Sequence, residues 1–228
     1  MSIEAAPHDR SGAVAGFLSL VIGAAAVAFE RGAVGRDASA QEMSDFLAAN
    51  GSAQRAQALL FVLGSGALIW FLGALRTFLA RAEGGSGNLA NVAFAAGVGS
   101  TILTLTALCF QAGLTLGSGR EALPALFAVM TALFNVANLP LAVMLLAVAV
   151  VTIRTRALPA WLAWLSLAAA ATQVVPLFGL VAQSGPLAFD GALSVYLPYP
   201  LYVAWLGCTS FVLFRRAGHP VRKPDAGD

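Results

Sequence analysis

Charged residues are scarce in this sequence. Of its 228 residues, 11% are charged and 59% are hydrophobic, and the formal net charge is +2. The mean hydropathy of +0.81 lies outside the range of ordinary soluble domains. The 13 Lys and Arg residues stand at the ends of apolar segments and form no patch that suits nucleic acid. These shortages favour a membrane protein and argue against nucleic acid as a partner.

Cysteine and histidine are also rare. Cys109 and Cys208 lie inside apolar runs with no CxxC spacing, which excludes a disulfide scaffold and a thiolate metal site. His8 and His219 fall in the polar ends of the chain, so we expect no haem or metal held by imidazole within the membrane. The HExxH and GxSxG motifs are missing as well. The sequence therefore predicts no metal, no cofactor and no enzymatic activity.

Long apolar stretches dominate what is present. Six of them reach about 20 residues, the length that a helix needs to cross the hydrocarbon core. We expect spans near residues 11–29, 56–79, 89–116, 123–153, 158–182 and 195–214, with a polar loop over residues 30–55. The predicted fold class is all-α, a polytopic transmembrane bundle of six helices.

The distribution of Lys and Arg predicts the orientation of this bundle. The side that carries the N-terminal tail holds Arg10, Arg76, Arg81, Arg154, Arg156, Arg215, Arg216, Arg222 and Lys223. The opposite side holds Arg31, Arg36, Arg55 and Arg120. Nine basic residues against four place both tails, residues 1–10 and 215–228, in the cytosol. An alternative stays open, because Arg10, the apolar run and Ala26-Val27-Ala28 also suit a cleavable secretory signal.

The loop over residues 30–55 contains a local helix signal. Ser39 and Glu42 have the spacing of a capping box, and Asn50 followed by Gly51 is typical of a helix end. Between them, Met43, Phe46 and Leu47 would share one apolar face. A short amphipathic helix at the outer surface and a partly ordered polar loop both fit this pattern.

Two carboxamides stand in the middle of the fourth predicted span. Asn135 and Asn138 share a helix face, and Pro140 removes the backbone donor for the carbonyl of Val136. One interpretation is a kinked helix that lines a polar cavity. The favoured interpretation is an interhelical clasp, in which the carboxamides bond neighbouring helices.

Further polar residues fall at related depths. Gln111 in the third span, and Gln173 with Pro176 in the fifth, could converge with Asn135 on a pocket that faces outward, with Pro176 as a second helix kink. Local hydrogen bonds to backbone or headgroups are the alternative for these glutamines. Charged residues are essentially missing from the spans, which argues against proton-coupled or ion-coupled carriers.

Aromatic and small residues complete the pattern. Trp161 and Trp164 follow the turn at Arg154 and Arg156, and the prediction is that they anchor the helix at the interface. An outer aromatic belt is predicted for Tyr196, Tyr199 and Tyr202. Pairs such as Gly12 with Gly16 give flat surfaces that suit close helix packing or contact with a second copy of the chain.

Two stretches resemble a known family. They are "FLAANGSAQRAQALLFVLGSGALIWFLGALRTFLARAEGGSGNLA" and "TRALPAWLAWLSLAAA". With the order of the spans, they look like a family of six-helix bacterial integral membrane proteins, mostly actinobacterial, whose function is unknown. The resemblance implies a bacterial inner-membrane location and transfers no catalytic residue.

These features predict a non-enzymatic structural or regulatory component of the bacterial plasma membrane. Its expected partners are the lipid bilayer and a membrane protein or second copy, with the basic rim of Arg215, Arg216, Arg222 and Lys223 as the contact surface. The alternative is a carrier or channel for a small neutral or lipophilic solute, with a pocket near Asn135 and Asn138.

Overall fold

The computed structural model describes residues 8–30, 38–116, 119–182, 184–188 and 191–217, without the side chains of residues 8, 9 and 195. Its helices are α1 (His8–Val27), α2 (Ala40–Glu83), α3 (Asn88–Thr115), α4 (Leu123–Thr155), α5 (Ala160–Val174), α6 (Ala192–Tyr196) and α7 (Pro198–Ala217). Two 3₁₀ helices, η1 (Arg120–Ala122) and η2 (Val175–Leu180), extend α4 and α5. The described part of the chain contains no strand.

Six helical segments are long and apolar enough to cross a membrane, which gives the chain the architecture of a multi-pass membrane protein. They are Arg10–Val27, Ala40–Glu83, Asn88–Thr115, Arg120–Thr155, Ala160–Leu180 and Ala192–Ala217. Many large apolar side chains on their outer faces are exposed, including Val21, Leu63, Trp70, Ile102 and Leu146. Such a surface is expected where lipid is the solvent. The predicted six-helix, all-α fold class is confirmed.

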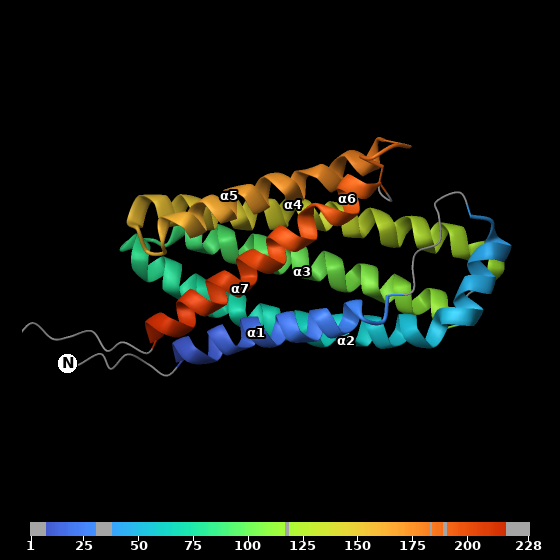
Figure 1. Ribbon diagram of the computed structural model, residues 1–228, viewed down its shortest axis with the longest axis horizontal. Helices are drawn as coiled ribbons and strands as arrows, with labels where there is room; N and C mark the ends of the chain where they lie inside the picture. Colours follow the sequence, from blue (N-terminus) through green and yellow to red (C-terminus); the bar gives the residue numbers. More distant parts are fainter. Residues whose placement is uncertain (1–7, 31–37, 117–118, 183, 189–190, 218–228) are drawn as a thin grey trace, which may run out of the picture.

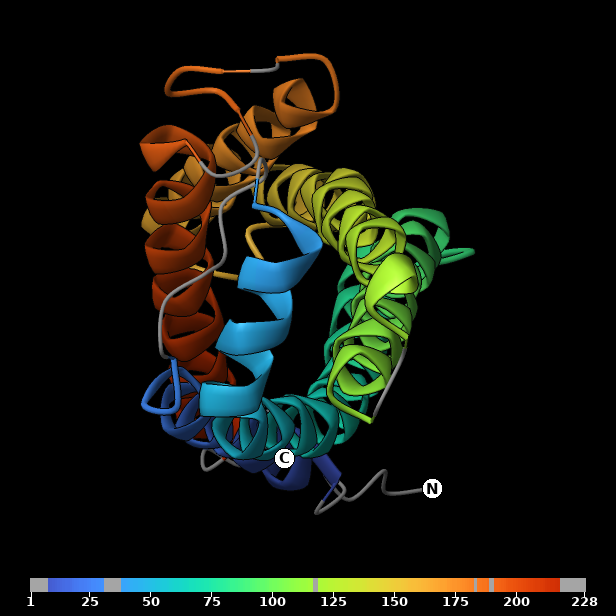
Figure 2. The same ribbon diagram turned by 90° about the vertical axis from the view of Figure 1, so that its right-hand side faces the viewer.

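The helices form a closed ring. Each of α1 to α5 packs against the next long helix in the chain, and α7 contacts both α5 and α1. Figure 1 shows that α1 begins and α7 ends at the same end of the bundle, and Figure 2 shows the ring from the other end. We call the first the basic end, because Arg81, Arg154, Arg156, Arg215 and Arg216 lie in its turns and helix ends. The opposite end is the cap end.

Residues 40–55 of the predicted loop over residues 30–55 are helical and form the first part of α2. The capping box is present, with Ser39 N donating to Glu42 Oε2 at 2.8 Å and Glu42 N donating to Ser39 Oγ at 3.2 Å. The predicted stop at Asn50 and Gly51 is wrong, since α2 continues unbroken to Glu83. Asn50 Nδ2 bonds the carbonyl of Phe46, 3.1 Å away, and Gly51 keeps a helical backbone. Arg31 and Arg36 lie outside the described residues.

The first part of α2, residues 40–55, is named the cap segment here. Figure 1 shows α2 changing direction between this segment and the rest of the helix, and Figure 2 shows the segment lying across the end of the ring. The pair Gly51 and Ser52 lies in this region, and Gly/Ser pairs are frequent sites of helix bending. The cap segment is held by a small apolar cluster of Met43, Leu114 and Leu123.

The main apolar core fills the half of the bundle near the basic end. Its largest members are Phe71, Leu72, Leu75, Leu79, Met144, Leu145, Val148, Leu162 and Trp205. Gly16 allows α1, α2 and α7 to meet there, because a Cβ at this position would lie 2.1 Å from Ser210 Oγ and 2.8 Å from Phe71 Cδ2. Polar side chains occupy the middle of the bundle, between this core and the cluster under the cap segment.

Candidate functional site

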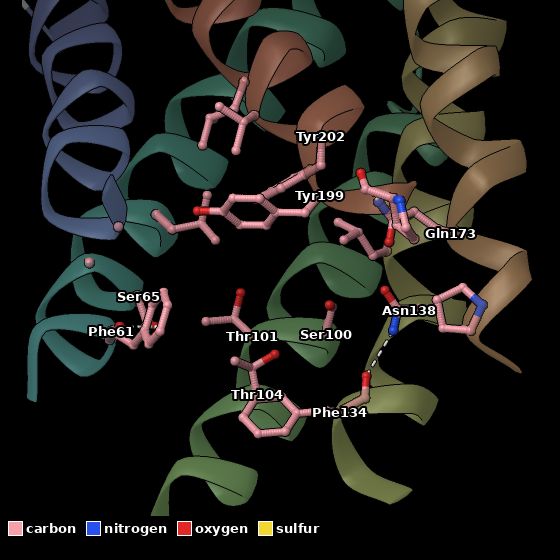
Figure 3. A pocket seen from close by; sticks show the side chains of 18 of the residues that line it. Phe61, Ser65, Ser100, Thr101, Thr104, Phe134, Asn138, Gln173, Tyr199 and Tyr202 are labelled. Carbon is pink, nitrogen blue, oxygen red and sulfur yellow. Dashed lines mark hydrogen bonds between the residues drawn. The ribbon is translucent and has the colours of Figure 1, made fainter. Parts of the chain in front are cut away.

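A cavity of about 710 Å³ lies between the two apolar clusters. Side chains from α1 to α5, η2, α6 and α7 line it, and Figure 3 shows several of them converging on one space. The volume is within the range of pockets that hold drug-sized ligands. A site of this size in the centre of the helix ring is the main candidate for function.

The lining is apolar with many uncharged polar groups. The hydroxyl and carboxamide side chains are Ser19, Ser65, Ser100, Thr101, Thr104, Thr131, Asn135, Asn138, Gln173 and Ser194. Aromatic rings come from Phe61, Phe127, Phe134 and three tyrosines. Among the described residues that line the cavity, none carries a formal charge. The site therefore suits a molecule that is mostly apolar and forms a few hydrogen bonds.

Asn135 and Asn138 line this cavity. Asn135 Nδ2 donates to the carbonyl of Thr131 at 3.0 Å, and Asn138 Nδ2 donates to the carbonyls of Phe134 and Asn135 at 2.8 and 3.2 Å. All of these acceptors belong to α4 itself, so the favoured interhelical clasp is wrong for these two amides. Since a backbone carbonyl can only accept, each NH₂ group faces its own helix. The two amide oxygens and the second N–H of Asn135 are then left for a ligand.

Pro140 does not interrupt α4, which runs continuously from Leu123 to Thr155. The Asn138 amide does not replace the donor that the Val136 carbonyl loses at Pro140, because it bonds the carbonyls of Phe134 and Asn135 instead. A clasp between α3 and α4 does exist close to this turn. Ser100 Oγ donates to the carbonyl of Ala137 at 2.8 Å, and both residues are buried. Sequence reasoning missed Ser100, although its place after Gly97 and Gly99 is typical of a close helix contact.

Gln173 joins the two asparagines on the cavity wall. Its Nε2 donates to the carbonyl of Pro198 on α7 at 3.3 Å, and its side chain is 2% exposed. Pro176 is buried in the first turn of η2, where the chain leaves the α-helix. It therefore ends α5 and does not act as a kink inside a continuous helix. The bond from Gln173 to Pro198 ties α5 to the start of α7.

The tyrosines predicted as an aromatic belt all line the cavity. Tyr202 stacks on the buried Trp205 with ring centroids 6.1 Å apart, and the Tyr199 hydroxyl lies 4.0 Å from the Cβ position of Gly23 on α1. Tyr196 is 75% exposed, so it lies at the edge of the cavity, where the cavity wall reaches the surface of the protein. Trp161 and Trp164 lie in the first turns of α5 near the basic end and are exposed.

A second, smaller cavity of about 170 Å³ lies under the cap segment. Gln111 lines this space and does not converge with Asn135. Its Nε2 donates to Gln54 Oε1 at 2.8 Å and to Gln57 Oε1 at 3.0 Å. Gln57 Nε2 in turn donates to Glu30 Oε2 at 2.7 Å. Gln54 and Gln57 were not anticipated, although their i, i+3 spacing places them on one face of α2.

Neither cavity has the donor set of a metal centre. In the described ranges of the chain, no group of three or more His, Cys, Asp or Glu side chains comes together. Cys109 is exposed and Cys208 is half-buried. The two cavities offer hydrogen bonding, aromatic contact and apolar burial, with the Glu30 carboxylate as a charged group in the smaller one.

Comparison with known proteins found no match to any family model, curated protein or solved structure. The resemblance to a bacterial six-helix family therefore stays a prediction.

Proposed function

We propose that this protein binds a small, mostly apolar molecule inside the membrane and acts as a carrier or receptor for it, without catalysing a reaction. The observation that supports this proposal is the cavity of about 710 Å³ with Asn135, Asn138 and Gln173 on its wall. A helix bundle with a purely structural role is expected to fill its centre with side chains, because protein interiors pack to the density of organic crystals. A cavity of this size, with polar groups in a mostly apolar wall, points to an occupant.

The direction of the hydrogen bonds indicates which hydrogen-bonding groups the ligand should carry. Both N–H groups of Asn138, one N–H each of Asn135 and Gln173, and the hydroxyl protons of Ser65, Ser100 and Thr101 are donated to backbone carbonyls. The three amides therefore present their oxygens as acceptors, while hydroxyls such as those of Thr104 and the tyrosines can donate or accept. A ligand with an apolar body and hydroxyl or N–H groups fits this lining.

The alternative proposal is a structural or regulatory component that contacts anionic lipid or another membrane protein at the basic end. It is supported by the arginines that gather there, among them Arg215 and Arg216 at the end of α7. The Arg216 guanidinium lies 6.0 Å from the ring centroid of Phe78 and also donates to the carbonyl of Ala157. Arg222 and Lys223 lie outside the described residues. In both proposals the expected location is the bacterial inner membrane.

Identification of the bound molecule tests the first proposal. The protein is purified in mild detergent, and native mass spectrometry records the masses that stay bound. We expect a defined small molecule in the wild type and its loss in Thr104→Phe, which places a ring in the cavity. Thr106→Phe is the matched control, because Thr106 lies on the exposed face of the same helix and does not line the cavity. Equal retention in both variants would contradict the proposal.

Transport can be separated from mere binding. The double variant Asn135→Leu with Asn138→Leu removes two acceptor oxygens from the cavity wall. If the protein is a carrier, reconstituted vesicles with this variant should show a flux of the identified molecule at least about tenfold lower, since each lost hydrogen bond in a membrane interior is worth roughly 1 kcal/mol. Unchanged flux would argue for a receptor or a structural role.

A further inference from the structure

The central cavity reaches the surface of the protein at one corner of the bundle. Of the described residues that line it, Tyr196 and Tyr199 are exposed, and the others are buried or half-buried. Both tyrosines belong to the corner where α6 meets α7. Across from them on α1, the Cβ position of Gly23 lies 4.0 Å from the Tyr199 hydroxyl, and Figure 3 shows the Tyr199 ring reaching from α7 toward α1. We call the opening between Gly23 and these two tyrosines the mouth of the cavity.

The surface around the mouth is apolar. Val27, one turn beyond Gly23 on α1, is exposed, and so are Leu193 and Leu197 beside the α6–α7 corner. The mouth also lies within the first and the last of the six segments that are long and apolar enough to cross a membrane. Apolar side chains on the outside of such segments face lipid. The mouth therefore opens sideways, toward the bilayer.

Both ends of the ring are closed by the described residues. Toward the basic end, the cavity meets the main apolar core, where Leu72 and Met144 belong to the core and also line the cavity. Toward the cap end, the smaller cavity and the cap segment follow, and Gln111 fastens this segment through its bond to Gln54. A molecule that came from water at either end would have to displace one of these layers, whereas a molecule in the lipid would not.

The amides that can hold a polar group lie across the cavity from α1. Asn135 and Asn138 are on α4, which is not a neighbour of α1 in the ring, and Figure 3 shows Asn138 on the far side of the space from α1. Their amide oxygens accept hydrogen bonds, and a hydroxyl is a donor that suits them. Since the described lining carries no formal charge, the head group that fits is uncharged. An apolar chain attached to it would extend back toward the mouth.

We propose that the central cavity takes its ligand sideways from the bilayer, and that this ligand is an uncharged single-chain lipid with a hydroxyl head group. The hydroxyl donates to the oxygens of Asn135 and Asn138, and the chain leaves the cavity through the mouth into the surrounding lipid. This inference rests on the proposed function, because it names the class and the entry route of the molecule that the same cavity binds.

One tryptophan can report the binding of simple probes. The full chain is placed in nanodiscs of zwitterionic lipid, with Trp70, Trp161 and Trp164 replaced by phenylalanine. The remaining Trp205 stacks on Tyr202 of the cavity wall, so its fluorescence should change when the cavity is filled. Titration measures affinity, and stopped-flow mixing measures the rate of association.

Decanol and 1-methoxydecane test the head group, because they share the apolar chain and only the alcohol can donate a hydrogen bond. Decanol should bind about threefold to fivefold more tightly than its methyl ether, the effect of one hydrogen bond inside a membrane protein. In the double variant Asn135→Leu with Asn138→Leu, this preference should disappear. Equal affinity of the two probes for the wild type would refute the hydroxyl head group.

Three variants test the route. Gly23→Phe should slow the association of decanol about tenfold, because the new ring must move before a chain can pass the mouth. Gly66→Phe is the matched control, since no heavy atom lies within 4 Å of its Cβ position and it does not line the cavity, and it should leave the rate unchanged. Leu47→Phe narrows the smaller cavity and should slow association only if the ligand enters from the cap end.

A widened mouth gives the opposite effect. Tyr199→Ala removes the ring that reaches toward α1 and should accelerate association, which tests the route even where Gly23→Phe does not fold. Melting temperatures identify a variant that has lost its fold. Equal slowing by Gly23→Phe and Gly66→Phe, or no acceleration in Tyr199→Ala, would overturn entry through the mouth.

The remaining outcomes separate this inference from the function on which it rests. If decanol binds and Leu47→Phe alone slows its association, the ligand enters from the cap end, so the route is wrong while the proposed function stands. If neither probe binds the wild type, the inference and the proposed function fail together.

Discussion

Single residues in this protein act through the direction of their hydrogen bonds. The Asn135 and Asn138 amides satisfy carbonyls of their own helix, whereas the shorter hydroxyl of Ser100 crosses to α4. Short side chains reach a neighbouring helix only where the backbones come close, and glycines such as Gly97 provide this proximity. A Cβ on Gly97 would lie 2.8 Å from Met144 Sδ and 2.9 Å from Leu72 Cδ2.

Ser100→Ala should reduce the free energy of unfolding by about 0.6 kcal/mol, the average for interhelical hydrogen bonds in a membrane protein, and by at most about 1.7 kcal/mol. The change removes the bond to the carbonyl of Ala137 and leaves a small residue that fits the same space. Unfolding in mixed detergent micelles measures the effect. Thr106→Val is the control, because the exposed Thr106 hydroxyl bonds only Ile102 of its own helix. A loss of the same size in Thr106→Val would refute the clasp.

Gly16→Ala should destabilise the bundle by about 1–3 kcal/mol, the usual cost of overpacking. Its new methyl group would meet Ser210 and Phe71, both fully buried at the junction of α1, α2 and α7. Gly66→Ala places the same group where no heavy atom lies within 4 Å, and should not lower stability. Thermal unfolding followed by circular dichroism compares the two variants, and equal melting temperatures would count against the close packing of α1.

At the level of elements, α2 differs most from expectation. It is one helix of 44 residues, in which a cap segment and a membrane span follow each other without a loop. The segment keeps its helical form through Asn50 and Gly51 because the Met43, Leu114 and Leu123 cluster fixes its position. A bond from Arg120 to Gln41 adds a polar contact to the α3–α4 turn region.

Loss of the cap should loosen this segment alone. Ser39→Ala removes an N-cap worth about 1 kcal/mol, which corresponds to roughly fivefold faster amide exchange. We expect hydrogen–deuterium exchange to accelerate over residues 40–50 and to stay unchanged in the second half of α2. The exposed Ser52→Ala, inside the helix and away from the cap, should not accelerate it. Faster exchange throughout α2 would show that the cap segment and the span unfold together.

The described charges are unevenly distributed between the two ends of the molecule. Arginines predominate in the turns of the basic end, whereas the cap end carries Glu30, Glu42, Asp45 and Glu121 together with Arg55 and Arg120. The ring of helices joins these ends around a cavity whose described lining is uncharged. A ligand that entered from the cap end would therefore meet charged side chains of both signs first and a mostly apolar surface afterwards.

Opposite ends of the bundle should be labelled from opposite sides of the membrane. In a background with Cys109→Ala and Cys208→Ala, single cysteines replace Ser86 in the α2–α3 turn and Gly119 in the α3–α4 turn. Both positions are exposed and belong to different ends. A membrane-impermeant maleimide should label the Gly119 position in intact cells and the Ser86 position only after permeabilisation. Labelling of Ser86 alone would reverse the orientation that the arginines predict, and labelling of both would contradict the crossing itself.

The sequence by itself determined that the chain is helical, where most of its spans lie and that Ser39 begins a helix. These properties follow from the apolarity of consecutive residues, the rise of each residue along a helix and bonds between near neighbours. Segment ends that depended on local signals alone were less secure, as the continuation of α2 through Gly51 shows.

Only the tertiary structure decided which polar groups share a space. It joined Gln173 to the two asparagines, assigned Gln111 to a different cavity and turned the tyrosines toward the centre. The physical reason is that lipid and the protein interior are about equally apolar. The sequence of an apolar span therefore contains little information about which of its faces points into the bundle. The rotation of each helix is set by its contacts with neighbours such as Gly16, Gly97 and Ser100, which come from distant parts of the chain.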